Sequence, residues 1–485
     1  MRLTRYGQLI VILRMIMVAA GLLSTGLPAH SQTSAEIQIR QTASKSDDFI
    51  CWTPVKSRIR LLAPPAEADV KVTLKSITAA AGAGAVGFLA ADSNLTARPA
   101  AELQIDLKKD GSWTDFYVAG LKPSSSGKDV SIRAELPNGA AAATDSLMVR
   151  VRKNAETLTL PERTAFLRAL ATWKSKPGQA RPTRFEDFYT AHADAFDLGI
   201  HSGFGANVSN FLPWHRAFLL NFERELQEID PTVALPYWKF DAPAPKLFSA
   251  DFLGSLADGS TEVQFDQTNP LRGWSKDGQS LRRFRVYPNR AAVNANNLET
   301  ILCLSHSPSC QDRQALYRAV TDSIELNYHN NAHAAVQGWL GGADSPSDPL
   351  FFFLHANVDR GWAHWQAAYA RFTADGSDAT SYAPVGAYPG TATNPRFRKG
   401  LYALDEMWPW GKPPTGNDPQ AKWLPYSFVF PASESLPLTP DLPPFPAKMV
   451  DYLGVSKLEN ALGVCYDDIG FHGEVLGPLA NRSAP

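Results

Sequence analysis

The sequence predicts a multidomain protein in which an N-terminal all-β sandwich is followed by a mainly α-helical domain. Between about residues 35 and 155, short runs of alternating apolar and polar residues recur between Gly, Pro, Ser and Asn clusters. From about residue 157 to 372, apolar residues recur instead at spacings of three and four, which is typical of helices. Eight of the ten histidines lie between residues 192 and 364, inside the predicted helical part.

The overall composition is that of a globular protein with no affinity for nucleic acid. The chain has 485 residues, of which 44% are hydrophobic and 20% charged, and this length suffices for two or three domains with separate cores. Its formal net charge is −1, and no basic run stands out locally. The electrostatic attraction that drives binding to phosphate backbones is therefore missing, and we expect no nucleic-acid partner.

The first 31 residues have the features of an export signal. "MRLTRYGQ" carries positive charge, "LIVILRMIMVAAGLL" is apolar, and Ala29 and Ser31 are small residues suited to cleavage. We therefore expect a signal peptide over residues 1–31, a mature chain starting near Gln32, and export to the periplasm or the medium. The apolar run contains Arg14 and is short for a bilayer, so a retained anchor is the weaker alternative and no membrane association is expected.

Residues 32–155 are expected to form a β-sandwich accessory domain. The alternating runs read "AEIQIRQ", "SRIRLL", "VKVTLKSI", "ELQIDLKK", "DFYVAG", "DVSIRAEL" and "SLMVRVRK". Alternation with a period of two places apolar side chains on one face of each strand, as in a sheet with one buried face. The segment contains no histidine, so we expect no imidazole metal site in it.

The four cysteines of an exported chain are candidates for disulfide bonds, with three possible pairings. Cys303 and Cys310 enclose a short loop, and their pairing would leave Cys51 with Cys465 for the second bond. Free thiols are the alternative.

The helical domain is expected over residues 156–428. Its first helix is indicated by "TLTLPERTAFLRALATWK", where a threonine can cap the helix and Pro161 suits its first turn. The remaining residues, 429–485, include six prolines between Pro431 and Pro446. This composition predicts an extended segment that packs over the helical body.

Three predicted helices carry histidines on one face. In "HNNAH", His329 and His333 are four residues apart and lie one above the other on a helix. In "FLPWHRAFLLNFERELQ" and "HANVDRGWAHWQAAY", His215 and His355 belong to apolar stripes that face inward. A solvated pair or a hydrogen-bonded core histidine would explain any one of them, but not all three together.

The pattern predicts a metal centre with nitrogen ligands. His192 and His201 precede the first histidine helix, so six imidazoles are available and divide naturally into two sets of three. Imidazole binds zinc, copper, iron and nickel, and ligand type alone does not choose among them. The chain has no "HExxH" glutamate beside the pair, which argues against zinc hydrolysis, whereas three-coordinate nitrogen sites suit copper cycling between Cu(I) and Cu(II).

Residues 157–372 resemble the central domain of the tyrosinase, or polyphenol oxidase, family of type 3 copper proteins. The matching motifs are "FLPWHRAFL" after two upstream histidines, and "HNNAH" followed by "DPLFFFLHANVDRGW". The resemblance implies a four-helix bundle that holds two copper ions, with dioxygen as co-substrate. By this resemblance one copper is bound by His192, His201 and His215, and the other by His329, His333 and His355.

The same resemblance gives roles to three further residues. Glu325 and Asn330 match the pair that holds a water able to take the proton of an incoming phenol, and a base there would help because phenols have a pKa near 10. Helix capping or solvated polarity is the alternative for both residues. Asp359 is expected to orient a ligand imidazole through its second nitrogen.

The family further implies a tyrosinase-like enzyme. It would hydroxylate monophenols to o-diphenols and oxidise o-diphenols to o-quinones, acting on a small tyrosine-like or catechol-like substrate, with a copper-delivery protein as a possible partner. The alternatives are a catechol or o-aminophenol oxidase without monophenolase activity, and a haemocyanin-like dioxygen-binding protein. Gly341, Gly342 or Ala343 stands where some plant enzymes place a bulky gate, and so small a residue favours access by phenols.

Overall fold

The computed structural model describes residues 33–39, 48–62, 67–95, 97–197, 201, 210–293, 298–302, 317–374, 402–411 and 444–471. Residues from Ser34 onward form one compact unit, and Met1–Thr33 form a second unit. The predicted signal peptide, residues 1–31, lies outside the described part. Among the described helices, none combines the length and apolar character needed to span a bilayer.

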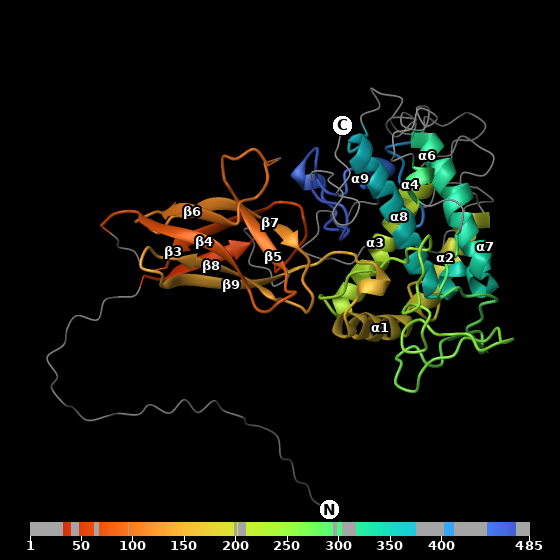
Figure 1. Cartoon of the computed structure of the whole chain (residues 1–485). Coiled ribbons are helices and arrows are strands. Elements are labelled where there is room, and N and C mark those ends of the chain that lie inside the picture. Colours follow the sequence, from red (N-terminus) through yellow and green to blue (C-terminus); the bar gives the residue numbers. More distant parts are fainter. Residues whose placement is uncertain are drawn as a thin grey trace, which may run out of the picture. The chain divides into compact units, whose positions relative to one another are not determined.

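The part of the chain before residue 150 is a region of β-strands, separate from the helices that follow (Figure 1). Its strands form two sheets, with orders β1-β3-β7-β5 and β2-β9-β8-β4-β6. All described pairings are antiparallel except that of β2 with β9. The strands are β1 (Ala35–Ile39), β2 (Phe49–Ile50), β3 (Val55–Leu61), β4 (Val70–Thr78), β5 (Ala85–Ala90), β6 (Glu102–Leu107), β7 (Thr114–Lys122), β8 (Val130–Glu135) and β9 (Ala141–Val149).

The predicted alternation appears directly in the burial of these strands. In β3 and β8 every second residue is buried, and Ile59 and Ile132 are fully covered. Each run singled out in the sequence overlaps a strand. The strands β2 and β5 were not predicted, because β2 has two residues and β5 is buried on both faces along most of its length and so shows no alternation.

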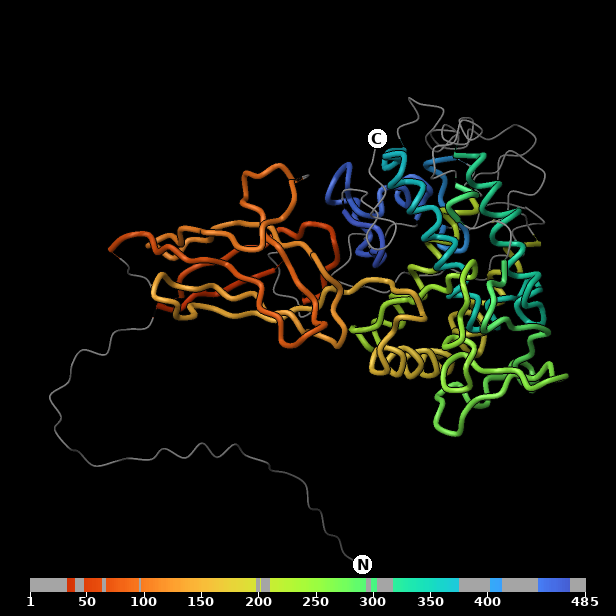
Figure 2. Tube along the Cα trace, in the orientation of Figure 1, coloured from red at the N-terminus to blue at the C-terminus, as the bar shows by residue number. Residues whose placement is uncertain are grey.

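The helical region follows at once, as the continuous trace from β9 to α1 shows (Figure 2). Thr159 caps α1 and forms a capping box with Glu162, with proline in the first turn as predicted. The helices are η1 (Ala155–Thr157), α1 (Leu160–Lys174), α2 (Arg184–Asp197), α3 (Phe211–Ile229), α4 (Leu298–Ile301), α6 (Tyr317–Ser323), η3 (Ile324–His329), α7 (Asn330–Val336), η4 (Gly338–Gly341), η5 (Ser345–Ser347), α8 (Leu350–Tyr369), α9 (Pro446–Val450) and η7 (Leu458–Asn460). A small hairpin pairs β10 (Ser275–Lys276) with β11 (Gln279–Ser280).

The core of this region is centred on α3 and α8. Residues 211–226 of α3 and 350–366 of α8 are all buried, so each helix is covered on every side rather than along one stripe. Their aromatic side chains interlock, with the Phe222 and Phe352 rings stacked and Trp173 of α1 meeting both edge to face. This packing fixes the relative register of the two helices that carry His215 and His355.

The C-terminal segment 444–471 contacts the β-region and the residues that directly follow it. Cys465 forms a disulfide bond with Cys51, which confirms the predicted pairing. The indole of Trp52 donates to the carbonyl of Tyr466 at 2.7 Å, and the Arg152 amide donates to the carbonyl of Cys465 at 2.8 Å. Cys303, Cys310 and the proline-rich residues 431–443 lie outside the described part of the chain.

Candidate metal centre

The first trio of histidines comprises His192, His201 and His215. His192 lies on α2, His215 lies in the first turns of α3, and His201 stands between the two helices. One nitrogen from each ring can be chosen so that all three lie within 4.8 Å of one another. All three residues are buried, and the rings of His192 and His201 have centroids 4.4 Å apart.

The second trio comprises His329, His333 and His355. The Nε2 atom of His355 lies 3.2 Å from Nε2 of His329 and 3.3 Å from Nε2 of His333. His329 ends the π-helical turn η3 and His333 lies on α7, so the pair is presented from one continuous helical segment. His355 comes from α8.

The two trios adjoin one another. The His215 and His355 rings are stacked, with centroids 4.2 Å apart and planes 17° apart, and each belongs to a different trio. Because α3 and α8 pack together through their aromatic residues, this contact is set by the core of the region. The structure therefore brings all six predicted histidines into one cluster, in which His329 and His333 are partly buried and the other four are buried.

Burial keeps these imidazoles neutral. It lowers the pKa of His201 and His333 to about 4, and it holds the pKa of the other four rings well below the usual value of 6.5. A neutral ring carries a lone pair on one nitrogen, and that lone pair is what binds a metal.

For several rings the local contacts also decide which nitrogen has the lone pair. Nδ1 of His215 lies 2.8 Å from the Phe211 carbonyl, Nδ1 of His192 lies 2.6 Å from the Ala343 carbonyl, and Nδ1 of His333 contacts the Leu340 carbonyl. A carbonyl oxygen can only accept, so each of these Nδ1 atoms donates and the lone pair is left on Nε2. The carbonyls carried no signal in the sequence, because any residue type can supply one.

The donor set fits a pair of cations. Nε2 of His215 and both ring nitrogens of His201 are buried without a hydrogen-bond partner among the described residues. In the second trio the Nε2 lone pairs of His329 and His333 face the His355 ring at close range, an arrangement that a shared cation would stabilise. Only imidazoles form these groups, which suits copper or zinc and not the hard cations that prefer oxygen.

Asp359 does not contact a ligand histidine in the way the sequence suggested. Its carboxylate accepts from Arg152 at 3.0 Å, from Arg216 at 2.5 Å and from the Tyr466 hydroxyl at 2.6 Å. Nδ1 of His355 has no partner in the described part of the chain. Two buried guanidinium groups compete more strongly for a carboxylate than a neutral imidazole does, so the carboxylate joins this cluster instead.

Glu325 and Asn330 both flank His329. Glu325 is 3% exposed, and its backbone carbonyl lies 3.3 Å from Nδ1 of His329. The side-chain oxygen of Asn330 lies 2.9 Å from the same nitrogen and so accepts its hydrogen. The Asn330 side chain thus contributes to the orientation of the His329 ring, whereas Glu325 reaches that ring only through its backbone carbonyl. Short π-helical turns such as η3 are frequent at functional sites.

The other histidines are separate from this cluster where the structure describes them. His364 is buried and its Nε2 lies 3.1 Å from Asp468, which also pairs with Arg360. His306 and His472 lie outside the described residues.

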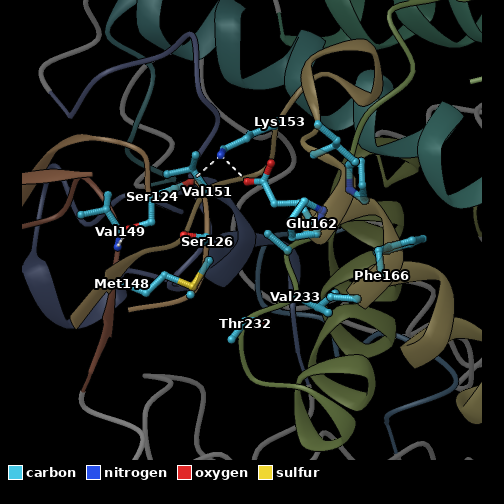
Figure 3. A pocket seen from close by; sticks show the side chains of 16 residues that line it. Ser124, Ser126, Met148, Val149, Val151, Lys153, Glu162, Phe166, Thr232 and Val233 are labelled. Carbon is cyan, nitrogen blue, oxygen red and sulfur yellow. Dashed lines mark hydrogen bonds and ion pairs between the residues drawn. The ribbon is translucent and has the colours of Figure 1, made fainter. Parts of the chain in front are cut away.

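A cavity of about 190 Å³ lies away from the histidines. It is bounded by the ends of the β-region, by α1 and by residues 232–236, and its lining contains no histidine. Figure 3 shows Lys153 and Glu162 pointing toward one another at its edge, where they form an ion pair. Glu162 also accepts from Thr159 as part of the capping box, so both charged side chains of this lining, Lys153 and Glu162, already have partners.

The fold and the cluster together define a class of protein, in which a helical region encloses two adjoining trios of neutral imidazoles. Comparison with known proteins agrees with this class. Residues 182–368 match the family model described as the common central domain of tyrosinase. A tyrosinase of Streptomyces glaucescens is 34% identical over 238 residues, which cover 44% of this chain and 82% of the relative.

Two further relatives widen the comparison. The grixazone synthase of Streptomyces griseus is 28% identical, covering 46% of this chain and 86% of that protein. A G-type hemocyanin of Enteroctopus dofleini is 26% identical, covering 44% of this chain and 8% of that protein. The chain belongs to the tyrosinase family of type 3 copper proteins.

Proposed function

We propose that this protein is a dicopper enzyme that hydroxylates monophenols to o-diphenols and oxidises o-diphenols to o-quinones with dioxygen. The observation that carries the proposal is the pair of adjoining histidine trios, joined by the stacked rings of His215 and His355. In this proposal His192, His201 and His215 hold one copper and His329, His333 and His355 hold the other. Bound copper would supply the redox chemistry with dioxygen.

The protein's own groups would prepare the site and handle the proton. Carbonyls of Phe211, Leu340 and Ala343 keep the lone pairs of three rings on Nε2. The Glu325 carboxylate would accept the phenolic proton, directly or through a water. Glu325 is buried and lies four residues before His329, whose ring its backbone carbonyl contacts. Asn330 would help to place that water and the His329 ring.

The enzyme is favoured over a dioxygen carrier by this buried acid beside the site. A carrier needs no proton acceptor, whereas hydroxylation of a phenol with a pKa near 10 benefits from one.

We further propose a domain organisation for this protein. Residues 1–31 are a signal peptide that is removed on export, and residues 32–155 are a β-sandwich accessory domain. Residues 156–428 are the dicopper domain, built around a four-helix bundle, and residues 429–485 pack on it.

The proposal is tested with purified full-length protein loaded with copper. Metal analysis should find two copper ions per chain, and the loaded protein should convert tyrosine and a catechol to quinone while consuming dioxygen. Quinone from the catechol alone would support the catechol oxidase alternative. Reversible dioxygen binding without quinone from either would support a carrier, and one ion per chain or zinc alone would refute the dicopper assignment.

A further inference from the structure

The loop at residues 338–343 touches both trios. The carbonyl of Leu340 accepts from His333 of the second trio, and the carbonyl of Ala343, three residues later, accepts from His192 of the first at 2.6 Å. By contrast, His215 and His329 are oriented within their own helical segments. His215 contacts the Phe211 carbonyl four residues earlier, and His329 contacts the Asn330 side chain and the Glu325 carbonyl. One short loop therefore orients one imidazole of each trio.

We propose that the 338–343 loop is a positioning element that couples the two metal sites, so that displacing it weakens metal binding at both. This inference rests on the proposed function in that the metal is taken to be copper. Partners of ligand imidazoles commonly change metal affinity by about 10- to 100-fold when they are lost. Here a single backbone shift would change such partners at two sites together.

The start of the loop packs closely against the backbone of residues 282–283. Gly338 has φ of +66°, and a Cβ there would come within 2.3 Å of the Arg282 carbonyl and 2.7 Å of the Arg283 Cα. The Trp339 amide donates to the same Arg282 carbonyl at 3.0 Å. Arg283 is fully buried and pairs with Asp348 through two hydrogen bonds of 2.7 Å, so residues 282–283 are themselves fixed. A side chain at Gly338 must therefore displace the loop.

The end of the loop is held by a more accessible contact. Asp344, which follows Ala343, forms an ion pair with Lys276, whose side chain is 16% exposed. The ammonium of Lys276 also lies over the Tyr189 and Trp339 rings. Loss of this ion pair should loosen Ala343 more than Leu340, and so affect the first trio more than the second.

The chain offers a matched control for the glycine substitution. Gly341 lies in the same loop, but a Cβ there would meet only the Gln337 Cβ, at the ordinary contact distance of 3.8 Å. Gly338→Ala and Gly341→Ala are the same chemical change three residues apart. Only the first forces the backbone to move.

The test compares wild type, Gly338→Ala, Gly341→Ala and Lys276→Gln as full-length copper-loaded proteins. Each is titrated with a competing chelator while total copper and the electron paramagnetic resonance of isolated Cu(II) are recorded, and circular dichroism checks the fold. We expect Gly338→Ala to release both ions at least 10-fold more readily and Gly341→Ala to match the wild type. Lys276→Gln should release one ion early and leave protein with a single, paramagnetically visible Cu(II).

Two results of this test would refute the coupling between the metal sites. If Gly338→Ala keeps both ions, or loses only one, the coupling is refuted. If Gly338→Ala fails to fold, Lys276→Gln still tests the role of the Ala343 contact. A copper-release curve of Lys276→Gln that equals the wild-type curve would then refute the proposed role of the loop. A wild-type protein that holds no copper pair would instead refute the proposed function. Failure of the coupling and failure of the proposed function therefore give different results.

Discussion

At the scale of single residues, the site depends on imidazoles that the protein makes neutral and then orients. Neutrality follows from burial, which lowers the pKa of all six rings. Orientation follows from acceptors such as Phe211 O and Ala343 O, which hold the Nδ1 hydrogen and leave Nε2 for the metal. The six histidines of the site were therefore predictable from the sequence, but the carbonyl groups that accept their Nδ1 hydrogens were not.

Glu325→Gln should separate the two reactions of the proposed enzyme. We expect kcat/KM for a monophenol to fall at least 10-fold, since general base catalysis contributes about 10²- to 10⁴-fold, while oxidation of a catechol changes little. Steady-state kinetics with tyrosine and a catechol check this. Asp322→Asn, one turn earlier and 45% exposed, serves as the control and should leave both reactions unchanged. Equal activity of Glu325→Gln and wild type on tyrosine would remove the proton-transfer role.

Asp467 gives the fold a pH dependence of its own. Burial, with Asp468 nearby, raises the pKa of Asp467 to about 6, from 3.8 in an unfolded chain, and its carboxyl accepts from the Tyr237 hydroxyl. Between these values the folded protein holds a proton that the unfolded chain has released. The stability contributed by this proton is therefore complete below pH 4 and is lost as pH rises through 6.

Asp467→Asn should remove the decrease in stability that the wild type shows as pH rises through 6. The asparagine amide stays neutral at every pH, and its oxygen still accepts a hydrogen bond from the Tyr237 hydroxyl. We expect the variant to gain stability relative to wild type between pH 4 and pH 7, by on the order of 1–3 kcal/mol. Urea unfolding at the two pH values measures the difference. If variant and wild type differ in free energy of unfolding by the same amount at pH 4 and at pH 7, the raised pKa of Asp467 would be contradicted.

At the scale of elements, local signals specified the helices well and the strands less completely. The threonine cap and first-turn proline of α1 were visible because they depend on residues a few positions apart. The helices α3 and α8 were found from their apolar spacing, but they are buried on every side and not along one inward stripe. The strands β2 and β5 left no alternating pattern, since β2 is very short and β5 is largely buried on both faces. Similarly, the π-helical turn η3 has no sequence signature by which we could have predicted it.

Thr159→Ala should measure how much the cap contributes to α1. The Thr159 side chain accepts from the Glu162 amide, and Glu162 accepts from the Thr159 amide in return. Loss of such a cap costs about 0.5–2 kcal/mol of the free energy of unfolding, which chemical denaturation can resolve. Thr172→Ala, at an exposed position of the same helix, should not destabilise the protein because alanine is the better helix former. Equal effects of the two changes would argue against the cap.

At the scale of the whole molecule, the β-region and the helical region are joined by contacts between residues far apart in the sequence. The Cys51–Cys465 disulfide spans 414 residues. Beside it, Arg152 pairs with Glu223 of α3 and Asp359 of α8, and the Tyr466 hydroxyl donates to Asp359. These buried charges therefore connect the end of the β-region to both central helices of the metal cluster.

Replacement of Cys51 and Cys465 by alanine should destabilise the protein. Closing so long a loop removes much of the freedom of the unfolded chain, and we expect a loss of about 2–5 kcal/mol in the free energy of unfolding. Guanidinium unfolding of the double variant and the wild type, both without reductant, measures this loss. An unchanged midpoint would show that the neighbouring hydrogen bonds hold the segment without the covalent bond.

The sequence by itself determined the order of the two regions, the main helices and the six histidines, because periodicity and residue spacing are local properties of the chain. It also indicated the Cys51–Cys465 pairing, which the structure confirms. Only the tertiary structure decided that His215 stacks on His355, that Asp359 binds two arginines rather than an imidazole, and that one loop serves both trios. Such contacts join residues distant in the chain, often through backbone atoms common to all residues, so they leave no pattern in the sequence.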